Sequence, residues 1–347
     1  MLSKGKYTRI LPLLFLPLLL VACGQKADSD TIRIGVALYL QDDTFISTLT
    51  QSLQQTALEE EQTLGVKINL NIVDGRGSQT AQNEQVDQFL DRDYDVICVN
   101  IVDRTAAAVI IDKAQGAGVP VVFFNREPVE EDLNRWKYAY YVGTRASEAG
   151  QIQGNLVLDA WRADPAAIDR NGDGVLQYVM LEGEPGHQDT LLRTEHSIRT
   201  LTAAGVAMEK LSNNSANWQR GPAKLRMQQW LDELGNSIEV VFANNDDMAL
   251  GAIDACLEAG LEAETMPFVV GVDATPPALK ALEEGTLRGT VLNDEAGQAA
   301  DILALCCALA RGEDPQNTVT LEGGKYAWRE HTAVTEENLA EFLPAEP

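Results

Sequence analysis

Short apolar runs alternate with longer amphipathic segments along most of the chain. In 31–39 the apolar residues fall at every second position, which predicts a strand with one buried face. Residues 95–102 are almost continuously apolar, as expected of a strand buried on both faces. The pattern predicts strands at 31–39, 67–73, 95–102, 119–124, 138–142, 177–182, 207–211, 239–243, 268–272 and 288–292. Helical patterns lie between most of them, including 46–63, 78–92, 105–117 and 295–311.

This alternation of strands and helices predicts an α/β fold with parallel sheets and right-handed crossovers. A chain of 347 residues is long for a single hydrophobic core. The strands also fall into two runs, separated by the polar segment 125–134. We therefore expect two doubly wound lobes. In open sheets of this type, ligands bind outside the carboxyl ends of the strands.

Polar planar side chains follow one predicted strand after another. They are Asp43, Asn100, His187, Asp189, Arg193, Asn245, Asp273 and Asn293. Each alone is more simply a helix N-cap, but together they offer carboxylates and amides that can bind vicinal hydroxyls. Phe45 and Trp218 can cover the C–H faces of a sugar ring, or they can be ordinary core residues. The set favours a neutral hexose, because an anion would require more Lys, Arg or free helix N-termini.

The segment 169–177, DRNGDGVLQ, has the spacing of a calcium loop. Oxygen-bearing side chains fall at alternate positions, namely Asp169, Asn171, Asp173 and Gln177. Val175 can add its backbone carbonyl to the six to eight or so oxygens that Ca²⁺ requires. However, the twelfth position, where an EF-hand has a bidentate Glu, is Met180. Either a distant carboxylate completes the site, or the segment is a polar turn between a helix and a strand.

Residues 1–22 have the organisation of a signal peptide. Basic residues precede an apolar stretch at 10–21, which contains two prolines and is too short for an ordinary membrane span. The stretch ends in LVACG, which resembles the lipobox of bacterial lipoproteins. Cleavage there would leave Cys23 at the N-terminus, carrying lipid, with 23–30 as a polar linker. The alternative is a plain secretory peptide with an incidental cysteine.

Four further cysteines, Cys98, Cys256, Cys306 and Cys307, lie in apolar strand or helix patterns. Their spacing does not match a zinc site. We interpret them as buried free thiols, despite the predicted export.

Charge and motif content exclude several functions. The net charge of −25 argues against nucleic acid and against electrostatic binding to anionic lipid. The sequence contains no G-x-S-x-G, H-E-x-x-H or Walker motif, and no G-x-G-x-x-G follows its first strand. We expect a binding protein and not an enzyme. A glycoside hydrolase is the alternative, with His187 and Asp189, or the carboxylates of Asp43 and Asp273, as acid and base.

Several longer segments carry a family resemblance. They are RIGVALYLQDDTF, NIVDRTAAAVI, VPVVFFNREP, YYVGT, LEGEPGHQD, IEVVFANNDDMALGA, GVDATPPAL and GTVLND. Through them the chain resembles the D-galactose/D-glucose-binding proteins, which belong to the type I, ribose-binding-protein-like periplasmic binding proteins. The resemblance covers essentially everything after residue 31.

The resemblance implies two lobes joined by three crossings, near 124–127, 293–295 and 326–329. The N-terminal lobe would comprise 31–125 and 294–327, and the C-terminal lobe 126–293 and 328–347. A hexose would lie between the lobes, stacked between Phe45 and Trp218. Asp43 and Asn100 would bind its hydroxyls from the N-terminal lobe. The second lobe and the hinge would contribute His187, Asp189, Arg193, Asn245, Asp273 and Asn293.

The resemblance also implies the distant carboxylate of the calcium loop, which would be Glu239. The calcium would be structural. The closed form, holding D-galactose or D-glucose, would be recognised by the permease of an ABC importer. Presentation of the sugar to a chemoreceptor or sensor kinase is an alternative that the sequence does not separate from transport. We expect a monomer that is tethered outside the cytoplasmic membrane by its lipid alone.

Overall fold

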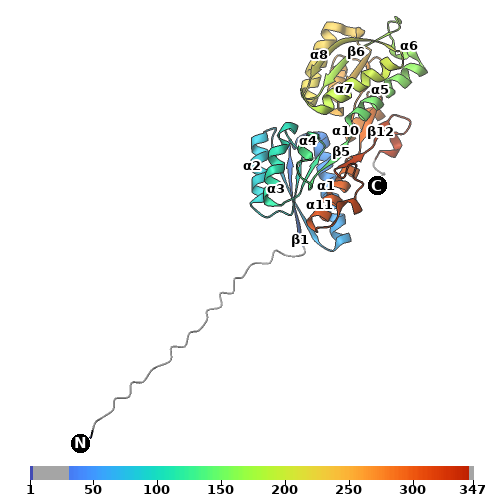
Figure 1. Cartoon of the computed structure of the whole chain (residues 1–347). Helices are drawn as coiled ribbons and strands as arrows, with labels where there is room; N and C mark the ends of the chain where they lie inside the picture. The colour runs from blue at the N-terminus through green and yellow to red at the C-terminus, as the bar shows by residue number, and fades with distance from the viewer. Residues whose placement is uncertain (3–30, 344–347) are drawn as a thin grey trace.

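A computed structural model describes residues 1–2 and 31–343 of the chain. The predicted lipidation site Cys23, the linker and nearly all of the signal peptide lie outside these residues. Within them, no helix is both long enough and apolar enough to cross a membrane. The chain folds into two α/β lobes, each built on a parallel sheet that is covered by helices (Figure 1). This confirms the predicted fold class.

The first lobe contains a six-stranded parallel sheet in the order β11-β5-β4-β3-β1-β2. Its strands are β1 (Thr31–Leu38), β2 (Lys67–Asp74), β3 (Val96–Val99), β4 (Val121–Phe124), β5 (Ala139–Thr144) and β11 (Tyr326–Arg329). Its α-helices are α1 (Thr44–Leu64), α2 (Gln79–Leu90), α3 (Ala107–Ala117), α4 (Glu130–Leu133) and α11 (Glu295–Ala310). In β3, Val96 and Cys98 pack with α1 and α11, whereas Ile97 and Val99 pack with α2 and α3. Burial on both faces explains why this strand is apolar throughout.

The second lobe contains a four-stranded parallel sheet in the order β7-β6-β8-β9. Its strands are β6 (Val175–Glu182), β7 (Ala207–Ser215), β8 (Val240–Ala243) and β9 (Phe268–Val270). A two-stranded antiparallel ribbon of β10 (Thr290–Asn293) and β12 (His331–Val334) adjoins it through parallel bridges to the β9 end. Its α-helices are α5 (Ala146–Ala163), α6 (Pro165–Ile168), α7 (Gln188–Ala203), α8 (Arg220–Leu234), α9 (Asp246–Glu258) and α10 (Pro276–Glu283). One face of the sheet packs with α5 and α7, and the other with α8, α9 and α10.

The chain crosses between the lobes three times, but two crossings differ from the predicted positions. The second lies between β10 and α11, as predicted. The first lies between β5 and α5, because β5 pairs with β4 in the first sheet. The boundary predicted at 125/126 was therefore wrong: the polar segment after β4 loops through α4 and returns to the same sheet. The third lies between β11 and β12, which belong to different sheets, and so falls just after the predicted 326–329.

Candidate ligand-binding site

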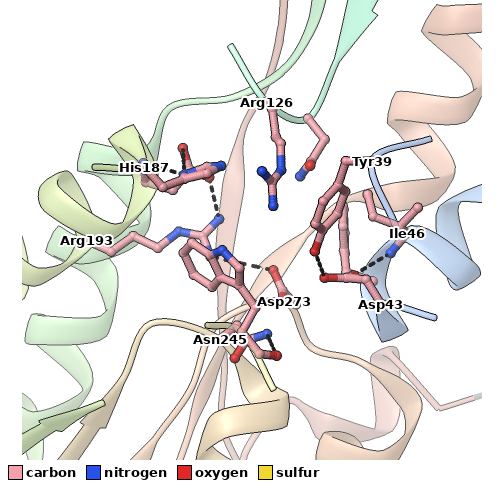
Figure 2. A pocket seen from close by; sticks show the side chains of 12 residues that line it. Tyr39, Asp43, Ile46, Arg126, His187, Arg193, Asn245 and Asp273 are labelled. Atoms are coloured by element: carbon pink, nitrogen blue, oxygen red, sulfur yellow. Dashed lines mark hydrogen bonds and ion pairs between the residues drawn. The ribbon is translucent and has the colours of Figure 1, made fainter. Parts of the chain in front are cut away.

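A pocket lies between the two lobes, where the strands of both sheets end (Figure 2). It contains about 340 Å³ of non-protein space, part of which is open to solvent. Eight of its lining residues were predicted from the sequence, namely Asp43, Phe45, His187, Asp189, Arg193, Trp218, Asn245 and Asp273. Four others were not predicted, namely Tyr39, Ile46, Asn125 and Arg126. Residues from six different strand ends therefore meet in one place.

Asp43 is fixed in the wall of the first lobe by two hydrogen bonds. As N-cap of α1, its Oδ1 accepts from the backbone N–H of Ile46 at 2.9 Å. Its Oδ2 accepts from the Tyr39 hydroxyl at 2.5 Å. Burial, and then the charge of Asp43, raise the pKa of Tyr39, so this hydroxyl stays a donor. The carboxylate is thus held in one orientation and has lone pairs left for a ligand.

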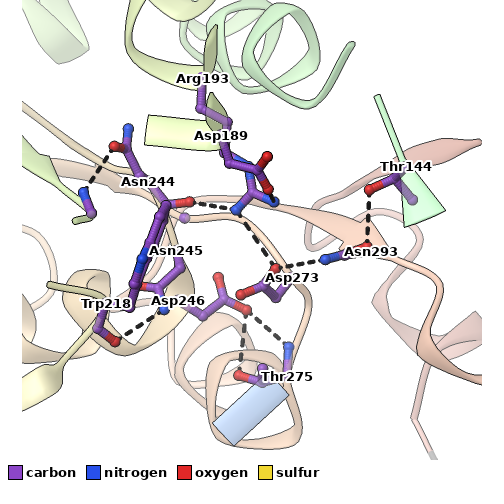
Figure 3. A network of polar contacts seen from close by, with 12 residues as sticks. Thr144, Asp189, Arg193, Trp218, Asn244, Asn245, Asp246, Asp273, Thr275 and Asn293 are labelled. Carbon is purple, nitrogen blue, oxygen red and sulfur yellow. Dashed lines mark hydrogen bonds and ion pairs between the residues drawn. The ribbon is translucent and has the colours of Figure 1, made fainter. Parts of the chain in front are cut away.

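Arg193 organises the opposite wall (Figure 3). It is only 3% exposed, and it donates through Nη1 to the carbonyl of Asn244 at 2.8 Å and through Nη2 to Asp189 Oδ2 at 3.2 Å. Nη1 also lies 3.8 Å from Asp273 Oδ1. Burial raises the pKa of Asp273 well above its usual value, and the Arg193 charge opposes this. The Arg193 Nε is buried and has no hydrogen-bond partner within the protein.

His187 is held in one tautomer by its place at the start of α7. Its Nδ1 accepts from the backbone N–H of Asp189 at 3.1 Å, which leaves the proton on Nε2. Burial lowers the pKa of His187 to about 4, so the ring is neutral at pH 7. The ring also meets the Trp218 indole edge to face, with centroids 5.2 Å apart. It therefore offers one donor beside an aromatic surface.

Trp218 and Asn245 are positioned together at the end of the second sheet. Asn245 Nδ2 donates to the Trp218 carbonyl at 3.2 Å, while its Oδ1 caps α9 at the N–H of Met248. The indole lies against Gly183, where an added Cβ would stand 2.2 Å from the ring. A side chain at Gly183 would therefore displace the indole, which explains the glycine at this strand end.

Asn100 and Asn293 were predicted to contact the ligand, but neither lines the pocket. Asn100 is fully buried, and its Nδ2 donates to Asn125 Oδ1 at 3.0 Å. Asn293 lies behind Asp273, donating from Nδ2 to its Oδ1 at 3.1 Å. Both hold a lining residue in place. Asn125 and Arg126 follow predicted strand 119–124 directly, so the strand-end rule could have found them.

The two lobes also contact each other at the rim of the pocket. Arg126 makes a bidentate ion pair across the cleft with Glu184, at 2.9 and 3.0 Å. Its guanidinium also lies 3.5 Å from the centre of the Tyr39 ring. Further along, the Thr44 hydroxyl donates to Asp247 at 2.7 Å, and Gln188 donates to Glu127 at 2.8 Å. Residues of both lobes thus close around the pocket.

The predicted calcium loop and Glu239 come together at the start of β6. Glu239 is 1% exposed, and its two oxygens accept from the backbone N–H of Arg170 at 2.7 Å and of Gln177 at 3.0 Å. Asp169 accepts from three loop amides, those of Gly172, Asp173 and Gly174. The side-chain amides of Asn171 and Gln177 both donate to Asp173 Oδ2, at 3.1 and 3.0 Å.

The loop carries carboxylates and side-chain amides, the donor types that a cation of the calcium type prefers. If each amide were turned by half a turn, its oxygen would take the place of its nitrogen. The oxygens of Asn171 and Gln177 could then bind a cation together with Asp173. Among residues 31–343, no three His, Cys, Asp or Glu side chains are grouped closely enough to hold a metal by themselves. Amide and backbone oxygens would therefore complete the shell, as is common for Ca²⁺.

Comparison with known proteins agrees with this architecture. Residues 34–314 match the family model of the periplasmic binding protein domain. The chain is 38% identical over 318 residues to the D-galactose/methyl-galactoside binding periplasmic protein MglB of Haemophilus influenzae, covering 90% of this chain and 92% of that protein. It is 29% identical to the xylitol-binding protein of Mycolicibacterium smegmatis, covering 85% and 78%. An ABC transporter solute binding protein from Bacillus halodurans, solved with bound myo-inositol, superimposes with a TM-score of 0.74 at 30% identity, covering 91% and 98%.

Two lobes with a polar pocket between them are the architecture expected of solute-binding proteins, and the family match agrees with this class. The chain belongs to the periplasmic binding protein family, in its type I sugar-binding branch, which serves ABC transporters. It is not an enzyme, and this confirms the prediction.

Proposed function

We propose that this protein captures D-galactose or D-glucose between its lobes and delivers the sugar to the permease of an ABC importer. The observation that carries the proposal is the convergence of eight predicted sugar-site residues on one interlobe pocket. The similarity to a galactose-binding relative supports the choice of hexose.

The chemistry of the wall suits the hydroxyls of a hexose. Carboxylates from both lobes, Asp43 and Asp273, accept hydrogen bonds, while Arg193 and the Nε2–H of His187 donate them. A sugar hydroxyl can do both, so it can bridge such pairs. A ligand that lacks one hydroxyl would leave a buried partner unpaired, which costs about 1–3 kcal/mol. The pocket would therefore discriminate by hydroxyl pattern.

Asp43 can explain how one pocket would bind both sugars. D-galactose and D-glucose differ in the orientation of one hydroxyl. Because the carboxylate of Asp43 is fixed at both oxygens and keeps free lone pairs, it can accept from either orientation. We therefore expect both epimers to bind.

Two truncations test the pocket. Asp273→Ala and Trp218→Ala should each weaken hexose binding by roughly tenfold or more, about 1.4 kcal/mol, because each removes a side chain that would contact the sugar. Asp112→Ala is a matched control: this residue pairs with Arg135 on the surface of the first lobe. Calorimetric titration of the three variants measures the effect. Unchanged affinity in both pocket variants would overturn the assignment.

The calcium loop would carry a structural Ca²⁺, held by Asp169, Asn171, Asp173, Gln177, Glu239 and the Val175 carbonyl. The support is the alternation of carboxylates and amides along the loop, where Asn171 and Gln177 contact Asp173 and the buried Glu239 accepts from the backbone of the loop. The ion would tie the α6–β6 connection to the start of β8. It lies outside the residues that line the pocket, so its role would be stability and not sugar contact.

We also propose that lipid on Cys23 tethers the mature protein to the membrane. The LVACG sequence and the apolar stretch before it support this. One saturated chain binds a membrane only weakly, so more than one is needed for a stable anchor. Cys23→Ser should move the protein from the membrane fraction to the soluble fraction of cells. Equal partition of wild type and variant would contradict the anchor.

A further inference from the structure

Two buried cysteines in the first lobe lie in direct contact. The Sγ atoms of Cys98 on β3 and Cys306 on α11 are 3.1 Å apart, although the residues are 208 positions apart in the chain. Both side chains are fully buried in the core that α1 and α11 form with the sheet. Sugar binding does not use either residue, because neither lines the pocket.

Cys98 and Cys306 are both free thiols in this structure, as expected from the sequence, and we propose that they form a disulfide bond in the exported protein. A disulfide requires the sulfurs at about 2.05 Å, so the observed contact needs to shorten by roughly 1 Å. The other described cysteines do not offer such a contact: Cys256 lies in the core of the second lobe, and Cys307 is the helix neighbour of Cys306.

The location of the protein supports the bond. Periplasmic binding proteins act outside the cytoplasm, where disulfides form and persist. A thiol–disulfide oxidant of that compartment would supply the chemistry. One thiolate attacks the oxidant's disulfide, and the second thiolate then displaces the oxidant from the mixed disulfide. The two cysteine thiols become one S–S bond, and the oxidant leaves as two thiols.

The position of the bond gives it a structural role. Helix α11 is the first element after the second crossing, and it packs on α1 and on β3. A bond from α11 to β3 therefore ties a late segment of the chain to a central strand of the first sheet. Cross-links that close long loops restrict the unfolded chain most. The pair would stabilise the first lobe against unfolding.

The folded protein should protect this pair from redox exchange. Burial raises the pKa of the Cys306 thiol well above its usual value, so little thiolate is present. Bond formation should therefore occur while the exported chain folds, before α11 covers β3. Once formed, the bond should resist reductant until the chain is unfolded.

Peptide mass mapping tests the proposal on the full chain exported by cells. The cells are quenched with N-ethylmaleimide in denaturant, without reductant. We expect the Cys98 and Cys306 peptides to be linked and two hydrogens lighter, while Cys256 and Cys307 are alkylated. Alkylation of all four cysteines would overturn the proposal, and so would a link from Cys98 to Cys307.

Two variants sharpen the result. Cys256→Ser should keep the linked peptide, whereas Cys306→Ser should leave Cys98 alkylated. Urea unfolding of the wild type in the presence of a thiol reductant should give a lower midpoint than unfolding of the oxidised protein, because the unfolded chain then loses the cross-link. The link itself is measured on the wild type, so the test stands even where a variant fails to fold. An oxidised protein with the same midpoint as its reduced form would contradict the stabilising role.

Discussion

At the scale of single residues, backbone strain is concentrated at the pocket. Among residues 31–343, seven non-glycine residues have positive φ angles. Three of them line the pocket, namely Asn125, Trp218 and Asp273, and two others, Asn217 and Ala274, are their chain neighbours. Such conformations cost about 1–3 kcal/mol each and persist where the surroundings fix them. Here they aim side chains from the strand ends into the space between the lobes.

His187 leads to a prediction about pH. Its pKa is about 4 in the folded protein and about 6.5 in an unfolded chain, so the unfolded state binds more protons between these values. Stability must then fall as the pH falls below about 6.5, and the loss is complete below about 4. Between pH 7 and 5 this residue accounts for a loss on the order of 2 kcal/mol.

The measurement is urea unfolding of wild type and His187→Asn at both pH values. Asn keeps an acceptor for the Asp189 N–H but does not titrate. The variant should lose about 2 kcal/mol less than the wild type between pH 7 and 5. Parallel losses in the two proteins would show that His187 does not carry this dependence.

Most of the polar residues that line the pocket could be predicted from the sequence. The rule that ligands lie beyond strand ends found six polar lining residues, and Phe45 and Trp218 were predicted separately as aromatic surfaces for a sugar. It placed Asn100 in the pocket as well, whereas Asn100 supports Asn125 from behind. Both asparagines follow a buried strand, and the sequence does not show which one the backbone turns towards the cleft. That depends on the φ of 59° at Asn125, which the surrounding fold sets.

At the scale of elements, the local pattern of apolar residues was sufficient to predict the strands that pack within their own lobe. All ten predicted strands are present, with ends shifted by a few residues. Strands β11 and β12 were not predicted as strands, because both are short and only partly buried. Their partners, β5 and β10, are distant in sequence. Pairing with a remote strand leaves no local signal in the sequence. The crossing between β11 and β12 was therefore misplaced by a few residues.

The calcium loop gives the prediction at this scale. Removal of Ca²⁺ by a chelator should lower the melting temperature by on the order of 5 °C, if the ion is present at about 100 times its dissociation constant. Glu239→Gln should reduce the response to the chelator, because it removes the buried carboxylate. Glu209→Gln, on the exposed side of the neighbouring strand β7, is the matched control and should respond as the wild type does. A chelator without effect on the wild type would argue for a polar turn.

At the scale of the whole molecule, the pocket exists only where the lobes meet. Asp43, Phe45 and Arg126 come from the first lobe, and the residues on β6 to β9 strand ends come from the second. A sugar that contacts both walls must favour the closed arrangement over an open one. The Arg126–Glu184 ion pair bridges the same cleft and supports closure from its rim. A permease that recognises the closed form would then distinguish loaded from empty protein.

The most direct test of this account is a calorimetric titration of the wild-type protein with D-galactose, D-glucose and D-ribose. We predict that both hexoses bind with a dissociation constant of roughly micromolar or lower, about −8 kcal/mol, and that ribose gives no heat. Absence of heat with both hexoses, or ribose binding as tight as theirs, would contradict the account.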